Sequence, residues 1–106
     1  MKHKTASLLK KVIFSFTLLS FNSFAYSECP YKTTALYIGD GGYLWMLFAG
    51  GGSAFIKPEN PDLKNIYALV LAAQMSDKSI VVRYQADNVS CTSGQRSDVQ
   101  GVWLYK

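Results

Sequence analysis

The sequence predicts a β-rich α+β domain with five strands, one helix and one disulfide. Three observations lead to this fold class. Short runs of β-branched and aromatic residues are separated by glycine-rich turns, which is typical of strands. A single segment repeats apolar residues with a helical period, and two cysteines lie far apart in the chain. The expected element order is β-β-β-α-β-β.

Residues 1–25 have the three-part pattern of a secretory signal peptide. Lysines without any acidic residue mark the first eleven positions, and an apolar run of ten residues extends from Val12 to Phe21. Ser23 and Ala25 then supply small side chains before the expected cut. Because about 20 apolar residues are needed to span a bilayer, we expect cleavage after Ala25 and no membrane span. Residues 26–106 then form a single small domain that is secreted or periplasmic.

The first part of this domain predicts a meander of three strands. Residues 26–32 are interpreted as an N-terminal arm. Glycine-rich turns suited to positive φ separate the strands. The expected strands are 34–38, 43–49 and 53–57, with turns at 39–42 and 50–52.

A helix and two further strands complete the prediction. Asn60 can cap a helix, Pro61 suits its first position and Asp62 favours its positive end. Apolar residues at i, i+3, i+4 and i+7 predict the helix itself over Leu63–Met75. The elements expected after it are a Val-rich strand over 79–86, a polar loop over 87–98 and a last strand over 99–105.

Two of these elements are apolar on every side. The strand 43–49 is apolar on both faces, whereas a solvent-facing antiparallel strand alternates apolar with polar residues. The helix contains six consecutive apolar residues, 68–73. Two interpretations stay open, a closed barrel plugged by the helix or a subunit interface. For a homo-oligomer, the candidate interface residues are Ala68, Leu69, Leu71 and Ala72.

The two cysteines, Cys29 and Cys91, predict one disulfide, because an even pair in a small exported domain is normally bridged. The closed loop is long, and the loop-entropy model gives its contribution as about 4 kcal/mol. A domain of this size gains only about 5 kcal/mol from its core. We therefore expect the bridge to be required for folding.

Charge and composition exclude several classes of function. The net charge of +4 comes from four lysines in residues 1–11, while the mature domain has seven basic and seven acidic residues, scattered singly. Nucleic-acid binding needs clustered lysine or arginine, so no nucleic-acid partner is expected. The only histidine, His3, precedes the predicted cut, which removes Ser-His and Cys-His catalysis and ordinary zinc sites. Neither glycine-rich turn has a phosphate-binding motif. The sequence predicts no enzyme activity, no metal and no cofactor.

The abundance of aromatic residues points to binding. Seven tyrosines and two tryptophans lie in the mature domain, and such rings stack on sugars or anchor protein partners. On the strand after the helix, polar and aromatic side chains stand together next to the disulfide loop. The candidate ligand groove consists of Arg83, Tyr84 and Gln85. Core packing is the alternative role for Trp45, Trp103 and Tyr37.

Residues 63–91, with the sequence LKNIYALVLAAQMSDKSIVVRYQADNVSC, resemble the B subunits of bacterial AB5 toxins, especially those similar to the subtilase cytotoxin B subunit. An apolar helix ends in a short polar turn, a Val-rich strand follows, and a disulfide cysteine comes soon after. The resemblance implies a five-stranded OB-like barrel, a ring of protomers assembled through strand edges and a central helix, and binding of cell-surface glycans. The mature domain is shorter than members of that group, and no sugar-binding residue can be matched to them.

The sequence therefore predicts an exported, non-enzymatic binding module that self-associates and recognises a glycan or a protein receptor. The alternative, from another class, is a periplasmic inhibitor or immunity-type protein that binds one partner protein. A third interpretation is a hydrolase that uses carboxylates, although no spacing of acidic residues indicates a catalytic pair.

Overall fold

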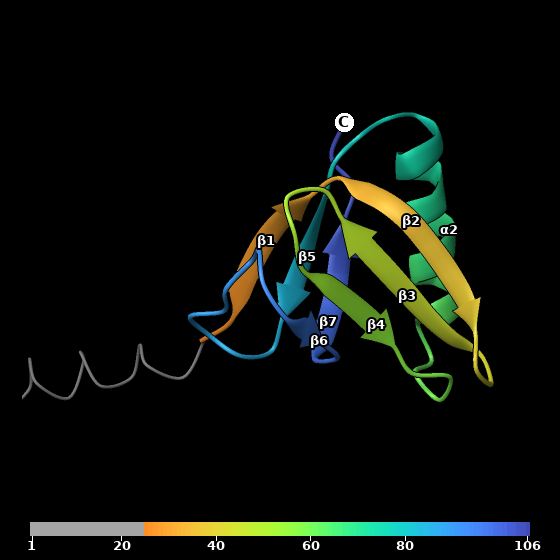
Figure 1. The fold of residues 1–106 in the computed structure, drawn as a ribbon, viewed down its shortest axis with the longest axis horizontal. Coiled ribbons are helices and arrows are strands. Elements are labelled where there is room, and N and C mark those ends of the chain that lie inside the picture. Colours follow the sequence, from red (N-terminus) through yellow and green to blue (C-terminus); the bar gives the residue numbers. More distant parts are fainter. Residues whose placement is uncertain (1–24) are drawn as a thin grey trace, which may run out of the picture.

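The computed structural model describes residues 25–106, and the expected signal peptide lies outside this range except for Ala25. Over the described residues the chain forms seven strands and one helix (Figure 1). In chain order these are β1 Ser27–Tyr31, β2 Thr33–Gly39, β3 Tyr43–Phe48, β4 Ser53–Ile56, α2 Leu63–Met75, β5 Ile80–Tyr84, β6 Gln95–Arg96 and β7 Val99–Trp103.

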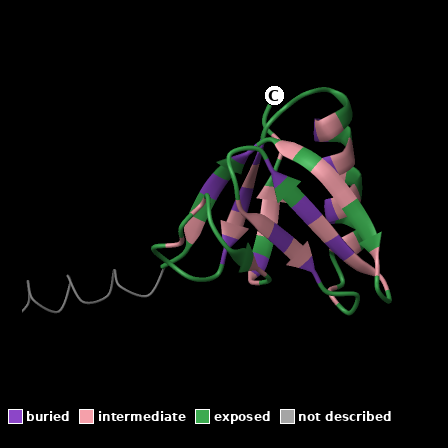
Figure 2. Cartoon of the chain, viewed as in Figure 1, coloured by how far each residue is buried: buried purple, intermediate pink, exposed green. Residues whose placement is uncertain are grey.

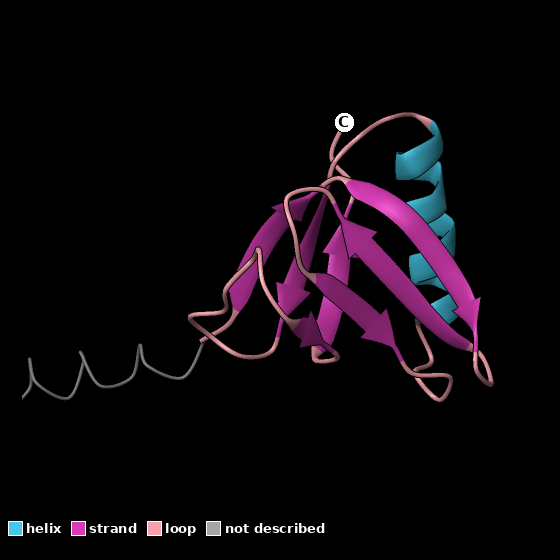
Figure 3. Cartoon of the chain, viewed as in Figure 1, coloured by secondary structure: helices cyan, strands magenta, loops and turns pink. Residues whose placement is uncertain are grey.

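The strands form two sheets (Figure 3). One sheet has the order β1-β5-β7 and is antiparallel throughout. The other has the order β2-β3-β4-β6, with a parallel pairing only between β4 and β6. A single residue, Lys32, separates β1 from β2, and residues 97–98 separate β6 from β7. The chain therefore crosses from one sheet to the other at two short links.

The expected β-rich class with one helix and one disulfide is confirmed, but the strand count is different. The five-stranded OB-like barrel is not confirmed, because the described residues form two open sheets with seven strands in all. The segment expected as an N-terminal arm is strand β1, in which Cys29 and Tyr31 are buried and Glu28 and Pro30 are exposed. Pro30 has no N–H for a sheet ladder, and it is tolerated because β1 is an edge strand. The second addition, β6, is only two residues long and has little sequence signal.

The core lies between the inner faces of the two sheets and α2. On β3, Leu44, Met46 and Phe48 point inward, with at most 5% of each residue exposed. Tyr43 and Trp45 on the opposite face are half-buried, so β3 buries only one of its two apolar faces (Figure 2). The other core residues are Ala54, Ile56, Ile66, Val70, Ala73, Ile80, Val82, Tyr84 and Val99, together with Cys29 and Tyr31.

The helix α2 spans the predicted residues, Leu63–Met75, and lies against β2 and β7 (Figure 1). The side chain of Asn60 accepts a hydrogen bond from the backbone of Asp62, at 2.8 Å. The predicted cap is wrong by two residues: Asp62 is the N-cap of the helix, and Asn60 orders the turn before it. Pro61 lies in that turn and not in the first helical position. At the other end, Ser76 Oγ donates to the carbonyl of Ala72, at 2.7 Å. No helix among residues 25–106 is long and apolar enough to cross a membrane.

Candidate functional site

The three residues of the predicted ligand groove are not brought together. Arg83 lies on the outer face of the β1-β5-β7 sheet, whereas the side chain of Tyr84 points inward and is fully buried. Gln85 follows the end of β5 and is exposed. Successive strand residues point to opposite faces, so three consecutive residues cannot line one groove on a strand. Of the three, Arg83 has the most extensive set of surface contacts.

Arg83 forms an ion pair with Glu28 across β5 and β1. Its Nε donates to Glu28 Oε2 at 2.9 Å, and one terminal nitrogen lies 2.9 Å from the same oxygen. The indole nitrogen of Trp103, on β7, donates to that oxygen as well, at 3.0 Å. One carboxylate oxygen therefore positions side chains from all three strands, and Oε1 accepts no hydrogen bond from residues 25–106.

Aromatic rings flank the guanidinium of Arg83. Its central carbon lies 4.2 Å from the ring centroid of Tyr26 and 5.9 Å from that of Trp103. The ring of Trp103 in turn stacks on Tyr105, with centroids 5.6 Å apart and planes 11° from parallel. Cation–π contacts of this kind contribute about 0.5–1 kcal/mol at exposed sites. The result is an ordered row of four flat groups on the sheet surface, formed by the guanidinium of Arg83 and the rings of Tyr26, Trp103 and Tyr105. We call this row, together with Glu28, the Arg83–Trp103 surface.

A shallow depression lies beside this row. Its volume is about 260 Å³, and it is lined by Arg83, Gln100, Gly101, Val102 and Trp103. Gly101 pairs directly with Arg83 across the β5–β7 ladder, and a Cβ atom at Gly101 would meet no other atom within 4 Å. The absence of a side chain at Gly101 thus leaves room on the sheet face between a guanidinium and an indole. The arrangement offers an aromatic face, hydrogen-bond donors and a carboxylate acceptor.

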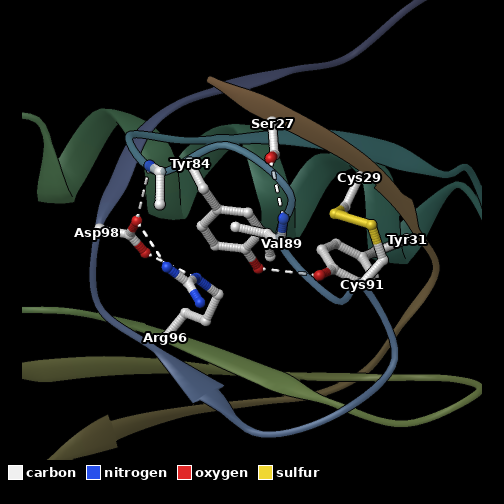
Figure 4. A network of polar contacts seen from close by, with 9 residues as sticks. Ser27, Cys29, Tyr31, Tyr84, Val89, Cys91, Arg96 and Asp98 are labelled. Carbon is white, nitrogen blue, oxygen red and sulfur yellow. Dashed lines mark hydrogen bonds and ion pairs between the residues drawn. A yellow bond between two sulfur atoms is a disulfide. The ribbon is translucent and has the colours of Figure 1, made fainter. Parts of the chain in front are cut away.

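Tyr84 belongs to a second cluster, inside the domain (Figure 4). Its hydroxyl is hydrogen-bonded to that of Tyr31 at 3.0 Å, and Arg96 lies over its ring, 5.4 Å from the centroid. Arg96 binds both carboxylate oxygens of Asp98, each at 2.9 Å. Asp98 also accepts a hydrogen bond from the backbone of Ala86, at 3.1 Å. This cluster joins the end of β5 to β6 and to the link between β6 and β7, and its contacts hold these segments together.

The electrostatics of the second cluster follow from these contacts. Burial, with a smaller contribution from the hydrogen bond to Tyr31, raises the pKa of Tyr84 far above its usual value. The hydrogen bonds from Arg96 lower the pKa of Asp98 below its ordinary value of 3.8, and the same bonds raise the pKa of Arg96. Asp98 is therefore ionised and Tyr84 neutral throughout the physiological pH range.

The predicted disulfide between Cys29 and Cys91 is confirmed, and it joins β1 to the loop after β5 (Figure 4). A hydrogen bond from the backbone of Val89 to Ser27 Oγ, 3.2 Å long, supports the same junction. The loop also contacts the glycine-rich turn between β3 and β4, where a Cβ at Gly51 would lie 2.5 Å from a backbone carbonyl oxygen. Gly51 has φ +108°, which also favours glycine. The close approach therefore requires glycine at position 51, whereas Gly50 has open space beside it and a positive φ of +87°.

The candidate oligomer residues lie on different sides of α2. Ala68 and Ala72 are exposed, whereas Leu69 is half-buried and packs against the core. Leu71 is also half-buried. The most exposed apolar side chain of the helix is Met75, with 79% of the residue accessible. The exposed residues of the helix are thus two alanines in the middle, Lys64 and Asn65 near the start, and Met75 at the end.

Other depressions have fewer convergent polar groups or no aromatic wall. The largest, about 620 Å³, is an apolar groove at the start of α2 that includes Ile38, Leu63 and Tyr67. Gln85 contributes to a polar depression of about 410 Å³ that includes Glu59 and Asp62. Within residues 25–106 no cluster of histidine, cysteine or acidic side chains could hold a metal ion.

Sequence reasoning missed Glu28, Gly101 and Tyr26 as members of the surface. The missing information was the pairing of β1 with β5 and of β5 with β7. These pairings bring Glu28 to Arg83, 55 positions away in the sequence, and to Trp103, 75 positions away. The alternation of buried and exposed residues in β1 was the available signal. No protein-family model matches this chain, and no curated protein matches it.

Proposed function

We propose that the protein is an exported, non-enzymatic module that binds a carbohydrate at the Arg83–Trp103 surface. The observation that carries this proposal is the depression over Gly101, bounded by the indole ring of Trp103 and by the guanidinium of Arg83, which is paired with Glu28. Aromatic rings offer a large, rigid apolar face, on which the C–H face of a sugar can stack. Charged groups held in place by neighbours form strong, directional hydrogen bonds, which suit sugar hydroxyls.

The size and charge of the surface favour a small, hydroxyl-rich ligand. The depression of about 260 Å³ lies just below the range of about 300–1,000 Å³ for small-molecule pockets, which suits a single sugar ring. Because Glu28 already neutralises Arg83, the surface has no strong excess of either sign. Polar recognition then depends on hydrogen bonds and not on net attraction.

The topology supports the finer expectation of an OB-like arrangement as part of this proposal. If β1 and β2 are counted as one bent strand, and β6 and β7 as another, the chain has five strands with the helix after the third. Lys32 and residues 97–98 are the only interruptions. This count agrees with the resemblance to AB5-toxin B subunits, whose members bind glycans and self-associate. Secretion or periplasmic residence also belongs to the proposal, and the disulfide is compatible with an oxidising compartment.

A glycan array probed with the oxidised, labelled protein tests the proposal. We expect selective binding that Trp103→Ala weakens by tenfold or more. The matched control is Tyr37→Ala, because Tyr37 and Trp103 are similarly exposed aromatic residues on different sheets, at 49% and 45%. Retention of full binding by a folded Trp103→Ala protein would contradict the proposal. Failure to bind any glycan, together with stoichiometric capture of one protein, would favour the inhibitor or immunity-type alternative.

A further inference from the structure

The strand residues on the outer face of β2, β3 and β4 are largely aromatic and include no charged side chain. Asp40, in the turn after β2, accepts a hydrogen bond from the Tyr37 hydroxyl at one end of this face, at 3.5 Å. Cross-strand pairs place Tyr37 beside Trp45 and Trp45 beside Phe55, while Leu47 pairs with Ala35 and Ser53. Alternation along the strands puts these side chains on the same face, opposite the core. We call this set the uncharged face, and its members are Ala35, Tyr37, Tyr43, Trp45, Leu47, Ser53 and Phe55.

Large parts of the uncharged face are accessible. Tyr37 is 49% and Leu47 43% exposed, and Tyr43, Trp45 and Phe55 are half-buried. Figure 2 shows buried residues alternating with half-buried or exposed ones along β3 and β4. An antiparallel sheet with one face in solvent normally has polar residues on that face. Contiguous apolar patches on a protein surface mark interaction sites, so this face needs a partner.

The geometry of the rings shows what kind of partner fits. The centroids of Trp45 and Phe55 are 4.6 Å apart, and their planes differ by 30°. This separation matches the spacing of neighbouring strands, about 4.8 Å, so the two rings stand upright and face each other. Tyr43, two residues before Trp45 on β3, has its centroid 6.1 Å from that of Phe55, with planes 48° apart. Upright rings present their edges to the outside and leave gaps between them. Such a surface interdigitates with apolar side chains and offers few open ring faces for a sugar.

We propose that a second copy of this chain packs on the uncharged face about a twofold axis. Charge determines which partner fits. A charged group of the partner that packed on this face would be buried without an opposite charge, at a large cost in free energy. The partner surface must therefore also be free of charged groups. The same face of another copy meets this condition, and a twofold interface brings identical patches together. Two sheets packed face to face interdigitate their side chains at a spacing of about 10 Å.

Two other surfaces of the described residues fit this role less well. The outer face of β1-β5-β7 holds the Glu28–Arg83 ion pair, whose burial carries a desolvation cost. On α2, the exposed apolar residues are Ala68, Ala72 and Met75. The two alanines are small and bury little area, and Met75 is a single large side chain at the end of the helix. Aromatic side chains bury about 150–250 Å² each. The proposal thus assigns self-association to the sheet and not to the helix, and it does not depend on carbohydrate binding at the opposite sheet.

Size exclusion with light scattering on the oxidised protein tests the pairing. We expect a mass of two protomers at micromolar concentration, and a change to one protomer on Leu47→Lys. The matched control is Met75→Lys on the helix, which should keep the mass of two protomers. Both substituted side chains are exposed, so circular dichroism should show both variants folded. In the wild-type dimer, Trp45 should also be shielded from a fluorescence quencher, and Leu47→Lys should remove this protection.

Three results would overturn the pairing. They are a wild-type mass other than two protomers, an unchanged mass on Leu47→Lys, and dissociation by Met75→Lys alone. Carbohydrate binding is measured on the same variants to separate this proposal from the proposed function. Leu47→Lys should retain binding, and Trp103→Ala should retain the dimer. Saturable binding of a sugar to the uncharged face, lost on Leu47→Lys in a monomeric protein, would also contradict the proposal.

Discussion

Reduction of the Cys29–Cys91 bridge should destabilise the domain severely. The bridged residues are 62 positions apart, and the loop-entropy model gives a contribution of about 4 kcal/mol at 25 °C for such a loop. For a domain of this size each 1 kcal/mol shifts the melting temperature by about 4–8 °C. We therefore expect the midpoint to fall by about 15–30 °C in dithiothreitol. Cys29 lies in the core, so loss of the bridge also loosens the loop after β5.

Thermal unfolding followed by circular dichroism measures this effect, with oxidised and reduced samples at equal concentration. The double variant Cys29→Ala/Cys91→Ala is the control, and its midpoint should not respond to reductant. A shift of less than about 5 °C on reduction would refute the loop-entropy reasoning. It would mean that the contacts between β1 and the loop hold the junction without the covalent bond.

Two further predictions concern the loop and its polar cluster. Gly51→Ala should lower the melting temperature more than Gly41→Ala, by about 4–8 °C for each additional kcal/mol. Both glycines have positive φ, but only a Cβ at Gly51 meets a backbone oxygen; equal shifts in calorimetry would remove the steric explanation. Because Arg96 lowers the pKa of Asp98, the unfolded chain takes up that proton first as the pH falls. The contribution of the Arg96–Asp98 pair to the free energy of unfolding is complete above pH 3.8, the ordinary pKa of Asp98. This contribution is lost as the pH falls from 3.8 through the lower pKa that Asp98 has in the folded protein. Between pH 6 and pH 2, the free energy of unfolding measured with urea should therefore fall less steeply for Asp98→Asn than for the native protein. Parallel curves of this free energy against pH would contradict the assignment.

Local signals in the sequence were sufficient for most elements of the fold. Apolar periodicity located α2 at the residues where it lies, and glycine-rich turns delimited β3 and β4. The alternation of strand β1 was present but was obscured by Pro30 and by its short length. The two-residue strand β6 exists only because Ser53 and Ala54 lie beside it, which is information about tertiary structure.

The two-sided apolar strand illustrates the limit of the sequence more sharply. The residues of β3 indicated correctly that both faces avoid charge, but two outcomes were consistent with that pattern. The structure buries Leu44 and Met46 and leaves Trp45 and Leu47 at the surface. A barrel interior and an exposed face have the same composition here, and only the packing of the sheets distinguishes them. The same limit applies to Arg83, whose neighbours come from two other strands.

The most direct test of carbohydrate binding is a graded series at Gly101, measured by calorimetric titration with the sugar that the array identifies. Gly101 lies in strand β7 with open space beside it, and a side chain there is expected to stabilise the strand, because glycine weakens strands. Gly101→Ala should weaken binding modestly and Gly101→Val by tenfold or more, while the melting temperature stays equal or rises. Unchanged affinity in Gly101→Val would contradict the assignment of the ligand to this surface.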